Sequence, residues 1–128
     1  NLVPSCVYTS PEIATVGITA DEAKAQGRAV ITGKYVMSGN GKSIIENEDR
    51  GFIKLVFDAE TEKLIGAQLM CGRATDMIGE MVTAVSAGMT KAQLAMALHP
   101  HPTFCEGITE AVHAADGHSI HTMPPRRR

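Results

Sequence analysis

A short segment of histidines, prolines and a glutamate late in the chain has the residue types and spacing that best fit chemistry. Residues 99–106 read His-Pro-His-Pro-Thr-Phe-Cys-Glu. The two prolines fix φ on both sides of His101, so a stiff loop presents its imidazole. A carboxylate that accepts from one ring nitrogen fixes the tautomer and leaves the other nitrogen as a base. His101 and Glu106 are therefore the candidate acid–base pair, suited to moving a proton near neutral pH.

Glu106 and the neighbouring histidines also have simpler interpretations. Glu106 lies three residues after Thr103, which is the spacing of a capping box at the start of a helix. The two roles are compatible, because one carboxylate oxygen can cap while the other accepts from His101. His99 and His101 form a His-x-His pair, but no third ligand stands at a useful spacing, so no metal site is predicted. We interpret the other histidines as solvated side chains: His113, His118 and His121.

The sequence lacks the motifs that would hold a nucleotide or activate a serine. It contains no GxGxxG after a strand, no P-loop and no GxSxG. Residues 39–43 resemble a phosphate loop only in composition, and we predict a hairpin turn or loop there. The three cysteines are scattered without a CxxC pair, which predicts reduced thiols in a cytoplasmic protein: Cys6, Cys71 and Cys105. An acid–base pair without a cofactor motif is typical of one part of an enzyme.

Length and composition predict one folded domain spanning residues 1–128. Hydrophobic residues make up 44% of the 128 residues and charged residues 20%, which is an ordinary globular composition. The formal net charge of −2 argues against nucleic acid as a partner. No apolar run approaches the roughly 20 residues that a membrane span needs, so no membrane partner is expected. The chain begins at Asn1 without Met, which suggests a fragment of a larger protein.

Strand patterns dominate the first half of the chain. A polar turn at residues 58–63 is so short that the strands on either side of it must be antiparallel. Thr19 and Glu22 form a capping box, which starts a helix that ends at Gly27. We expect a meander of about three strands, with one more possible near the start. The extended segments are residues 4–9, 13–18, 29–37, 52–57 and 64–70.

Helical periodicity takes over after residue 72. Thr90 and Gln93 form a second capping box, ahead of a short helix, and Thr103 with Glu106 forms a third. Strands followed by helices predict the α+β class, with an antiparallel sheet covered on one face by helices. Gly117 is expected to end the last helix, and the tail beyond it to be irregular. Two apolar stripes mark the longer helices: Met77, Ile78, Met81, Val82 and Val85, then Phe104, Ile108, Ala111, Val112 and Ala115.

The ordered motifs resemble a known family across residues 3–115. They are Tyr8–Gly17, Gly51–Leu55, Leu64–Ala67 and His101-Pro102-Thr103 with Glu106. This set resembles the C-terminal dimerisation domain of the FAD-dependent pyridine nucleotide–disulfide oxidoreductases. Within the family it is most similar to the dihydrolipoyl dehydrogenases, whose signature reads His-Ala-His-Pro-Thr before the glutamate. Proline replaces that alanine here, and glutathione and trypanothione reductases share the dyad, so the substrate stays open.

The resemblance implies a division of labour within a larger flavoenzyme. FAD, NAD(P) and the redox-active cysteine pair would belong to upstream domains, so the fragment alone is expected to bind no cofactor and to be inactive. His101 would exchange a proton with a dithiol substrate such as dihydrolipoamide at the partner subunit's site, while Glu106 holds its ring. The peptide between His101 and Pro102 is expected to be cis, with the His101 carbonyl reaching the partner's flavin.

The remaining expectations concern a partner chain and alternative functions. The apolar faces at residues 77–85 and 104–115 are expected to exceed what one small domain can bury, which predicts a symmetric homodimer. The alternative function is a free-standing dimerisation or binding module without catalytic activity. A third interpretation is a metal-binding regulatory domain that would use His99, His101 and the histidines of the tail. An upstream dinucleotide-binding motif followed by a cysteine pair would favour the flavoenzyme.

Overall fold

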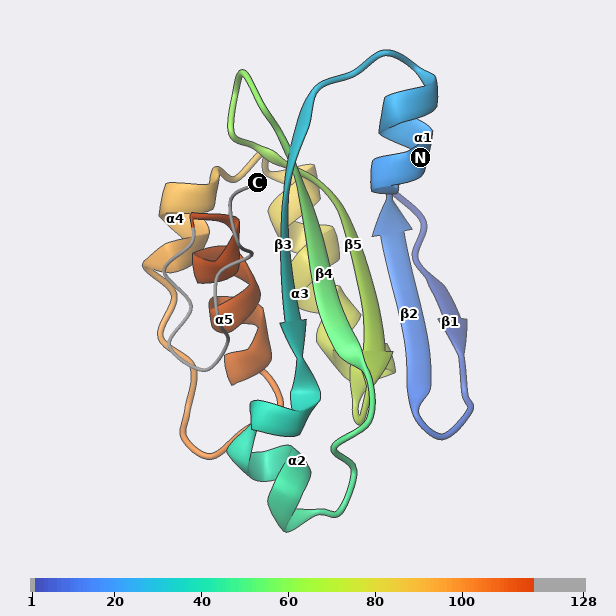
Figure 1. Ribbon diagram of the computed structural model, residues 1–128, viewed down its shortest axis with the longest axis vertical. Helices are drawn as coiled ribbons and strands as arrows, with labels where there is room; N and C mark the ends of the chain where they lie inside the picture. Colours follow the sequence, from blue (N-terminus) through green and yellow to red (C-terminus); the bar gives the residue numbers. More distant parts are fainter. Residues whose placement is uncertain (1, 117–128) are drawn as a thin grey trace, which may run out of the picture.

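The computed structural model describes residues 2–116 and contains a five-stranded antiparallel sheet with helices (Figure 1). The strand order across the sheet is β1-β2-β5-β4-β3. The strands are β1 (Ser5–Val7), β2 (Glu12–Gly17), β3 (Val30–Val36), β4 (Phe52–Asp58) and β5 (Leu64–Cys71). The helices are α1 (Ala20–Ala25), the 3-10 turn η1 (Met37–Gly39), α2 (Gly41–Ile45), α3 (Ala74–Ser86), α4 (Lys91–Ala95) and α5 (Glu106–Ala115).

The predicted meander is confirmed, and the sheet is wider than expected. Strands β3, β4 and β5 are consecutive antiparallel neighbours, as the short turn between β4 and β5 requires. Two strands near the start join them instead of one, because β1 pairs with β2 and β2 pairs with β5. The Ser10–Pro11 peptide, which is cis, lies in the turn between β1 and β2. The α+β class with an antiparallel sheet is therefore correct.

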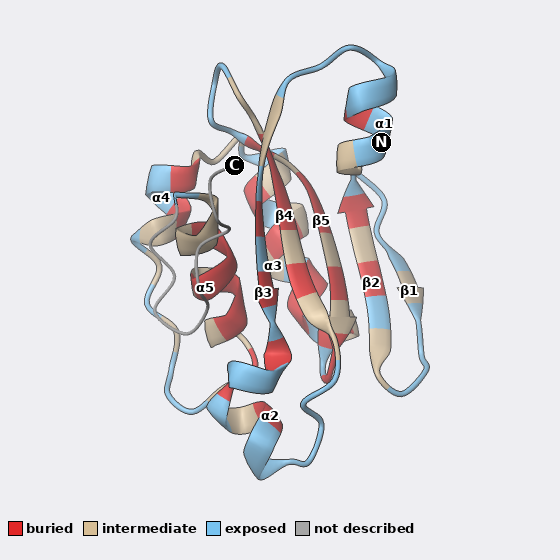
Figure 2. Cartoon of the chain, viewed as in Figure 1, coloured by how far each residue is buried: buried red, intermediate tan, exposed pale blue. Residues whose placement is uncertain are grey.

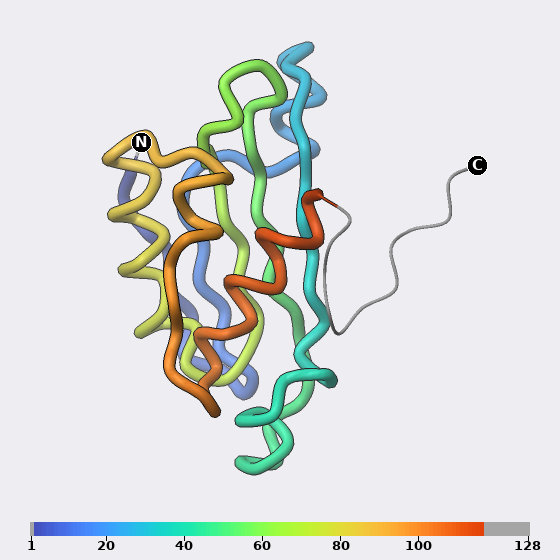
Figure 3. The backbone as a smooth tube through the Cα atoms, turned by 90° about the vertical axis from the view of Figure 1, so that its left-hand side faces the viewer, coloured from blue at the N-terminus to red at the C-terminus, as the bar shows by residue number. Residues whose placement is uncertain are grey.

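One face of the sheet carries the core. Helix α3 packs on β2 and β5, and α5 packs on β3 and β4 (Figures 1 and 3). The strand side chains beneath the two helices share one face by register, and all are buried (Figure 2). They are Ala14, Val16, Tyr35, Ile53, Leu55, Ala67 and Leu69. The helices thus cover a single face, which is the predicted layer order.

The prediction that a partner must cover the two apolar helix faces is wrong. Both stripes are buried within the chain itself, because the sheet is wide enough for α3 and α5 to lie against the same face. Only Val82, Val85 and Ala115 among the expected stripe residues remain partly exposed. The burial of the helix stripes therefore gives no evidence for a dimer contact. The buried stripe residues are Met77, Ile78 and Met81 on α3 and Phe104, Ile108, Ala111 and Val112 on or just before α5.

The prediction of a loop at residues 39–43 is also wrong. The segment forms the 3-10 turn η1 and then the short helix α2. Asn40 caps α2, since its Oδ1 accepts from the backbone nitrogen of Ser43 at 2.9 Å and from the Ser43 hydroxyl at 2.8 Å. The glycines on either side of Asn40 suggested a turn and hid this helix start.

Two of the three predicted capping boxes are confirmed, at the starts of α1 and α4. The third forms only in part. The Thr103 backbone nitrogen donates to Glu106 Oε1 at 3.0 Å, but the Thr103 hydroxyl donates to the carbonyl of Pro100 at 2.7 Å instead of capping the helix. The expected helix end at Gly117 and the tail lie outside the described residues. Among residues 2–116, no helix is both long and apolar enough to cross a bilayer.

Candidate acid–base site

His101 and Glu106 are in direct contact. Nδ1 of His101 lies 2.9 Å from Oε1 and 3.0 Å from Oε2 of Glu106. A carboxylate accepts, so Nδ1 carries the proton and Nε2 of the neutral ring is the base. The His101 side chain is 78% exposed, and within the described residues its Nε2 makes no hydrogen bond. The site therefore presents an oriented imidazole whose free nitrogen can exchange a proton with an outside group.

The turn that carries His101 is held by its own hydrogen bonds. The His101–Pro102 peptide is cis, as the resemblance implied. Glu106 Oε1 accepts from both the Thr103 nitrogen and His101, so a single oxygen fixes the turn and the ring. The Thr103 hydroxyl closes the turn onto the carbonyl of Pro100. Local sequence thus determines most of the geometry of the candidate dyad.

Asn40 is a supporting residue that the sequence analysis missed. Besides capping α2, its Nδ2 donates to the carbonyl of Thr103 at 3.0 Å, which joins two segments 63 residues apart. Asn40 is only 4% exposed, and helix α2 and the loop before α5 meet at one end of the sheet (Figure 1). Buried Asn40 therefore links the start of α2 to the turn that carries His101. The sequence signal was its position as a capping residue.

His99 and His101 do not face a common ligand position. The ring of His99 bonds to Glu80 and Thr109, whereas the ring of His101 bonds to Glu106. The Glu80 carboxylate raises the pKa of His99, against the opposing effect of burial. Across residues 2–116, no three histidine, cysteine or acidic side chains come together as a metal would require. Sequence reasoning missed Glu80 and Thr109, because both contacts depend on how α3 and α5 pack.

The three cysteines are free thiols, as predicted. Cys71 is fully buried, and burial raises its pKa to about 12. Cys105, beside Glu106, is half-buried, and its pKa is also raised by burial. A thiol that stays protonated is a poor nucleophile. Cys71 and Cys105 are therefore not suited to nucleophilic attack.

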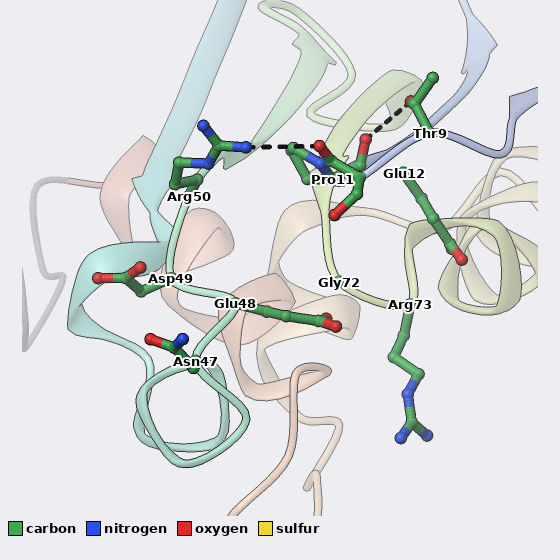
Figure 4. A pocket seen from close by; sticks show the side chains of 10 residues that line it. Thr9, Pro11, Glu12, Asn47, Glu48, Asp49, Arg50, Gly72 and Arg73 are labelled. Carbon is green, nitrogen blue, oxygen red and sulfur yellow. Dashed lines mark hydrogen bonds between the residues drawn. The ribbon is translucent and has the colours of Figure 1, made fainter.

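A cavity of about 360 Å³ lies near this end of the sheet (Figure 4). Arg50 points to the turn between β1 and β2, where it contacts the carbonyl of Ser10 at 3.5 Å. Glu12 binds the start of α3, accepting from the nitrogen and hydroxyl of Thr75 at 3.0 and 2.7 Å. The dyad is not part of this cavity. The cavity is lined by Thr9, Ser10, Pro11, Glu12, Asn47, Glu48, Asp49, Arg50, Gly72 and Arg73.

Comparison with curated proteins identifies relatives over almost the whole chain. Dihydrolipoyl dehydrogenase from Bacillus subtilis is 44% identical over 120 residues, covering 94% of this chain and 25% of that protein. The enzyme of the same name from Halobacterium salinarum is 38% identical over 121 residues, covering 94% and 26%. The chain thus spans about a quarter of the length of these relatives.

Solved structures and a family model agree with these matches. LpdA from Mycobacterium tuberculosis superposes with a TM-score of 0.82 at 28% identity, over 88% of this chain and 24% of that one. The HOCl-induced flavoprotein disulfide reductase RclA from Escherichia coli gives 0.82 at 24% identity, over 86% and 25%, and shows the fold alone. The model of the pyridine nucleotide-disulphide oxidoreductase dimerisation domain matches residues 3–112. The chain belongs to this family, as its ordered motifs predicted.

Proposed function

We propose that this chain is the C-terminal dimerisation domain of a flavin-dependent dithiol–disulfide oxidoreductase that resembles dihydrolipoyl dehydrogenase. In this proposal residues 1–128 are one interface domain, and His101 with Glu106 forms the acid–base dyad at the partner subunit's active site. The observation that carries it is the 2.9 Å contact between Nδ1 of His101 and Glu106 on an exposed, rigid turn. The relatives named above support the reaction class.

The dyad acts on thiol protons. A substrate thiol gives its proton to Nε2 of His101, its sulfur attacks one sulfur of a disulfide, and the other sulfur leaves as a thiolate. Glu106 accepts a hydrogen bond from Nδ1–H throughout, which keeps the ring oriented and stabilises the imidazolium while it exists. In the reverse direction the imidazolium returns the proton to the departing thiolate. We propose dihydrolipoamide as the dithiol.

FAD and NAD(P) belong to the full-length protein in this proposal, where the flavin would pass electrons between the disulfide and the nicotinamide. The exposed turn fits an approach to the flavin. His101 and Pro102 are both exposed, and no described residue donates to the carbonyl of His101. That carbonyl could therefore face a partner group without losing a bond. The chain alone is expected to bind neither cofactor and to lack activity, and the whole protein to be a cytoplasmic homodimer.

The proposal is tested by measuring the two half-reactions separately in the full-length protein. Replacing His101 by Gln removes the base, so flavin reduction by dihydrolipoamide should slow on the order of 10²- to 10⁴-fold. Flavin reduction by the nicotinamide needs no thiol proton and should keep its wild-type rate.

His113→Gln is the matched control, because His113 lies on α5 away from the dyad. Equal loss in both half-reactions of His101→Gln would show that the dyad does not handle the thiol proton. If the His101→Gln protein still dimerises and both flavin-reduction rates are unchanged, the domain is a binding module.

A further inference from the structure

His99 is a largely buried histidine that the proposed proton transfer does not use. Its side chain is only 10% exposed, yet both ring nitrogens have partners. Nδ1 lies 2.7 Å from the hydroxyl of Thr109, and Nε2 lies 2.9 Å from Oε1 of Glu80. Thr109 belongs to α5 and Glu80 to α3, so one imidazole joins both sheet-covering helices to the loop between α4 and α5.

These two bonds survive a change of protonation. Nε2 donates to the Glu80 carboxylate in either state, because a carboxylate only accepts. The Thr109 hydroxyl can donate to Nδ1 of the neutral ring or accept from Nδ1 of the charged ring. Glu80 and Glu106 are the charged groups that act on His99, and both favour its charged form. Both hydrogen bonds can therefore persist whether His99 is neutral or charged, although the charged ring binds Glu80 more strongly.

His99 lies directly before the dyad. Met96 and Leu98 are 80% and 96% exposed, so neither of these two large apolar side chains anchors the loop ahead of His99. Only Pro100 separates His99 from His101, and its fixed φ transmits the position of one histidine to the next. Thr109 lies three residues after Glu106 on α5, which places both on neighbouring positions of one helix. His99 therefore holds the loop of His101 against the helix that carries Glu106.

We propose that His99 is a positioning residue, which sets the placement of His101 relative to Glu106 through its bonds to Glu80 and Thr109. This inference rests on the proposed function above. Groups that orient a catalytic base through a second layer of hydrogen bonds affect the rate of the reaction. Small displacements of a reacting group slow that reaction strongly. Loss of the His99 bonds should therefore slow the proton-dependent step without touching electron transfer from the nicotinamide.

The experiment uses the full-length protein and follows flavin reduction by dihydrolipoamide and by the nicotinamide separately. His99→Ala should slow the dihydrolipoamide step by roughly 10- to 100-fold and leave the nicotinamide step unchanged. Thr109→Val removes only the hydroxyl and should slow the same step by a smaller factor. Thr109→Ser keeps the hydroxyl and should keep the wild-type rate. If only the size of the side chain mattered, serine would not restore the rate. His113→Ala is the matched histidine control.

Three results would decide against this role. A wild-type ratio of the two half-reactions in His99→Ala overturns the inference, and if His101→Gln is slow in the same assay the proposed function stands. Equal losses in both half-reactions with a lower melting temperature mean that His99 only stabilises the fold. If His99→Ala does not fold, equal rates for Thr109→Val and Thr109→Ser contradict the positioning role. A wild-type ratio in His101→Gln would instead reject the proposed function itself.

Discussion

Glu106 shows how one carboxylate can hold a turn and orient a neighbouring imidazole at the same time. Its Oε1 accepts from the Thr103 backbone nitrogen at 3.0 Å and from Nδ1 of His101 at 2.9 Å, while Oε2 approaches the same ring nitrogen at 3.0 Å. The six residues from His101 to Glu106 thus contain the proposed base, the group that orients it and most of the turn that holds both. The compact spacing explains why the pair could be recognised from the sequence.

At this scale the charge of Glu106 can be tested apart from its shape. Glu106→Gln keeps an oxygen that accepts from Thr103 but cannot stabilise an imidazolium. Flavin reduction by dihydrolipoamide in the full-length protein should slow by roughly 10- to 100-fold, which is less than the loss from removing the base itself. In the His101→Gln background the same change should cost nothing more, since no imidazolium forms. Equal losses in the two backgrounds would show that Glu106 acts independently of His101.

The other residues around the turn explain where sequence analysis stopped. Asn40 contacts Thr103 across 63 residues of sequence, and His99 contacts Glu80 across 19. Such pairs depend on how helices pack on the sheet, and no local spacing encodes them. The third capping box was half wrong for a similar reason, because the Thr103 hydroxyl bonds to Pro100 once the loop bends back.

Among the elements, the approach of α5 to β3 places the dyad. Gly33 on β3 is buried beneath α5, where an added Cβ would overlap the carbonyl oxygen of Ala111 and crowd the nitrogen of Ala115 at 2.9 Å. A glycine is required here because backbone meets backbone. Since α5 begins at Glu106, its height above the sheet also fixes the position of that carboxylate.

Gly33→Ala should therefore force α5 away from the sheet. We expect about 1–3 kcal/mol of destabilisation from overpacking, together with a slower dihydrolipoamide half-reaction. Gly79→Ala on α3 is the control, because nothing lies within 4 Å of its added Cβ. The control should gain about 0.5–1 kcal/mol from helix propensity. Thermal melting of the full-length variants measures both effects, and a Gly33→Ala protein as stable as wild type would contradict the close packing.

The ion pair between His99 and Glu80 makes the link between α3 and the loop dependent on pH. Glu80 raises the pKa of His99 above its ordinary 6.5. Charged His99 contributes its full stabilisation of the fold below about pH 6.5, and this contribution is lost as pH rises through the raised pKa. Glu80→Gln should thus weaken amide-exchange protection of residues 97–105 more at pH 6 than at pH 9, relative to wild type at each pH. An equal difference at both values would contradict a change in the charge of His99 between pH 6 and pH 9.

The elements themselves were largely predictable, because their signals are local. The polar turn at residues 58–63 gave the antiparallel pair of β4 and β5, and Thr19 with Glu22 gave the start of α1. The short helix α2 was missed because glycines on both sides of Asn40 have low helix propensity. Its stability comes from the Asn40 cap and from the contact with Thr103, and the second of these depends on the fold.

At the scale of the molecule, the chain spans only about a quarter of its curated relatives. The described residues offer an oriented base but no group that carries electrons, so the proposed activity needs the rest of the protein. Most of both apolar helix stripes is buried within one chain, which leaves only Val82, Val85 and Ala115 of them partly exposed. The exposed turn of His101 remains the feature that would reach a second subunit.

The central claim is that His101 serves the active site of the partner subunit. Hybrid dimers test it most directly, with one full-length subunit carrying His101→Gln and the other lacking its proposed redox-active cysteine pair. If the dyad acts across the dimer, the first subunit's cysteines meet the second subunit's His101, and one of the two sites reduces its flavin with dihydrolipoamide at the wild-type rate. If the dyad acts within its own subunit, neither site is complete, and an inactive hybrid would contradict the account.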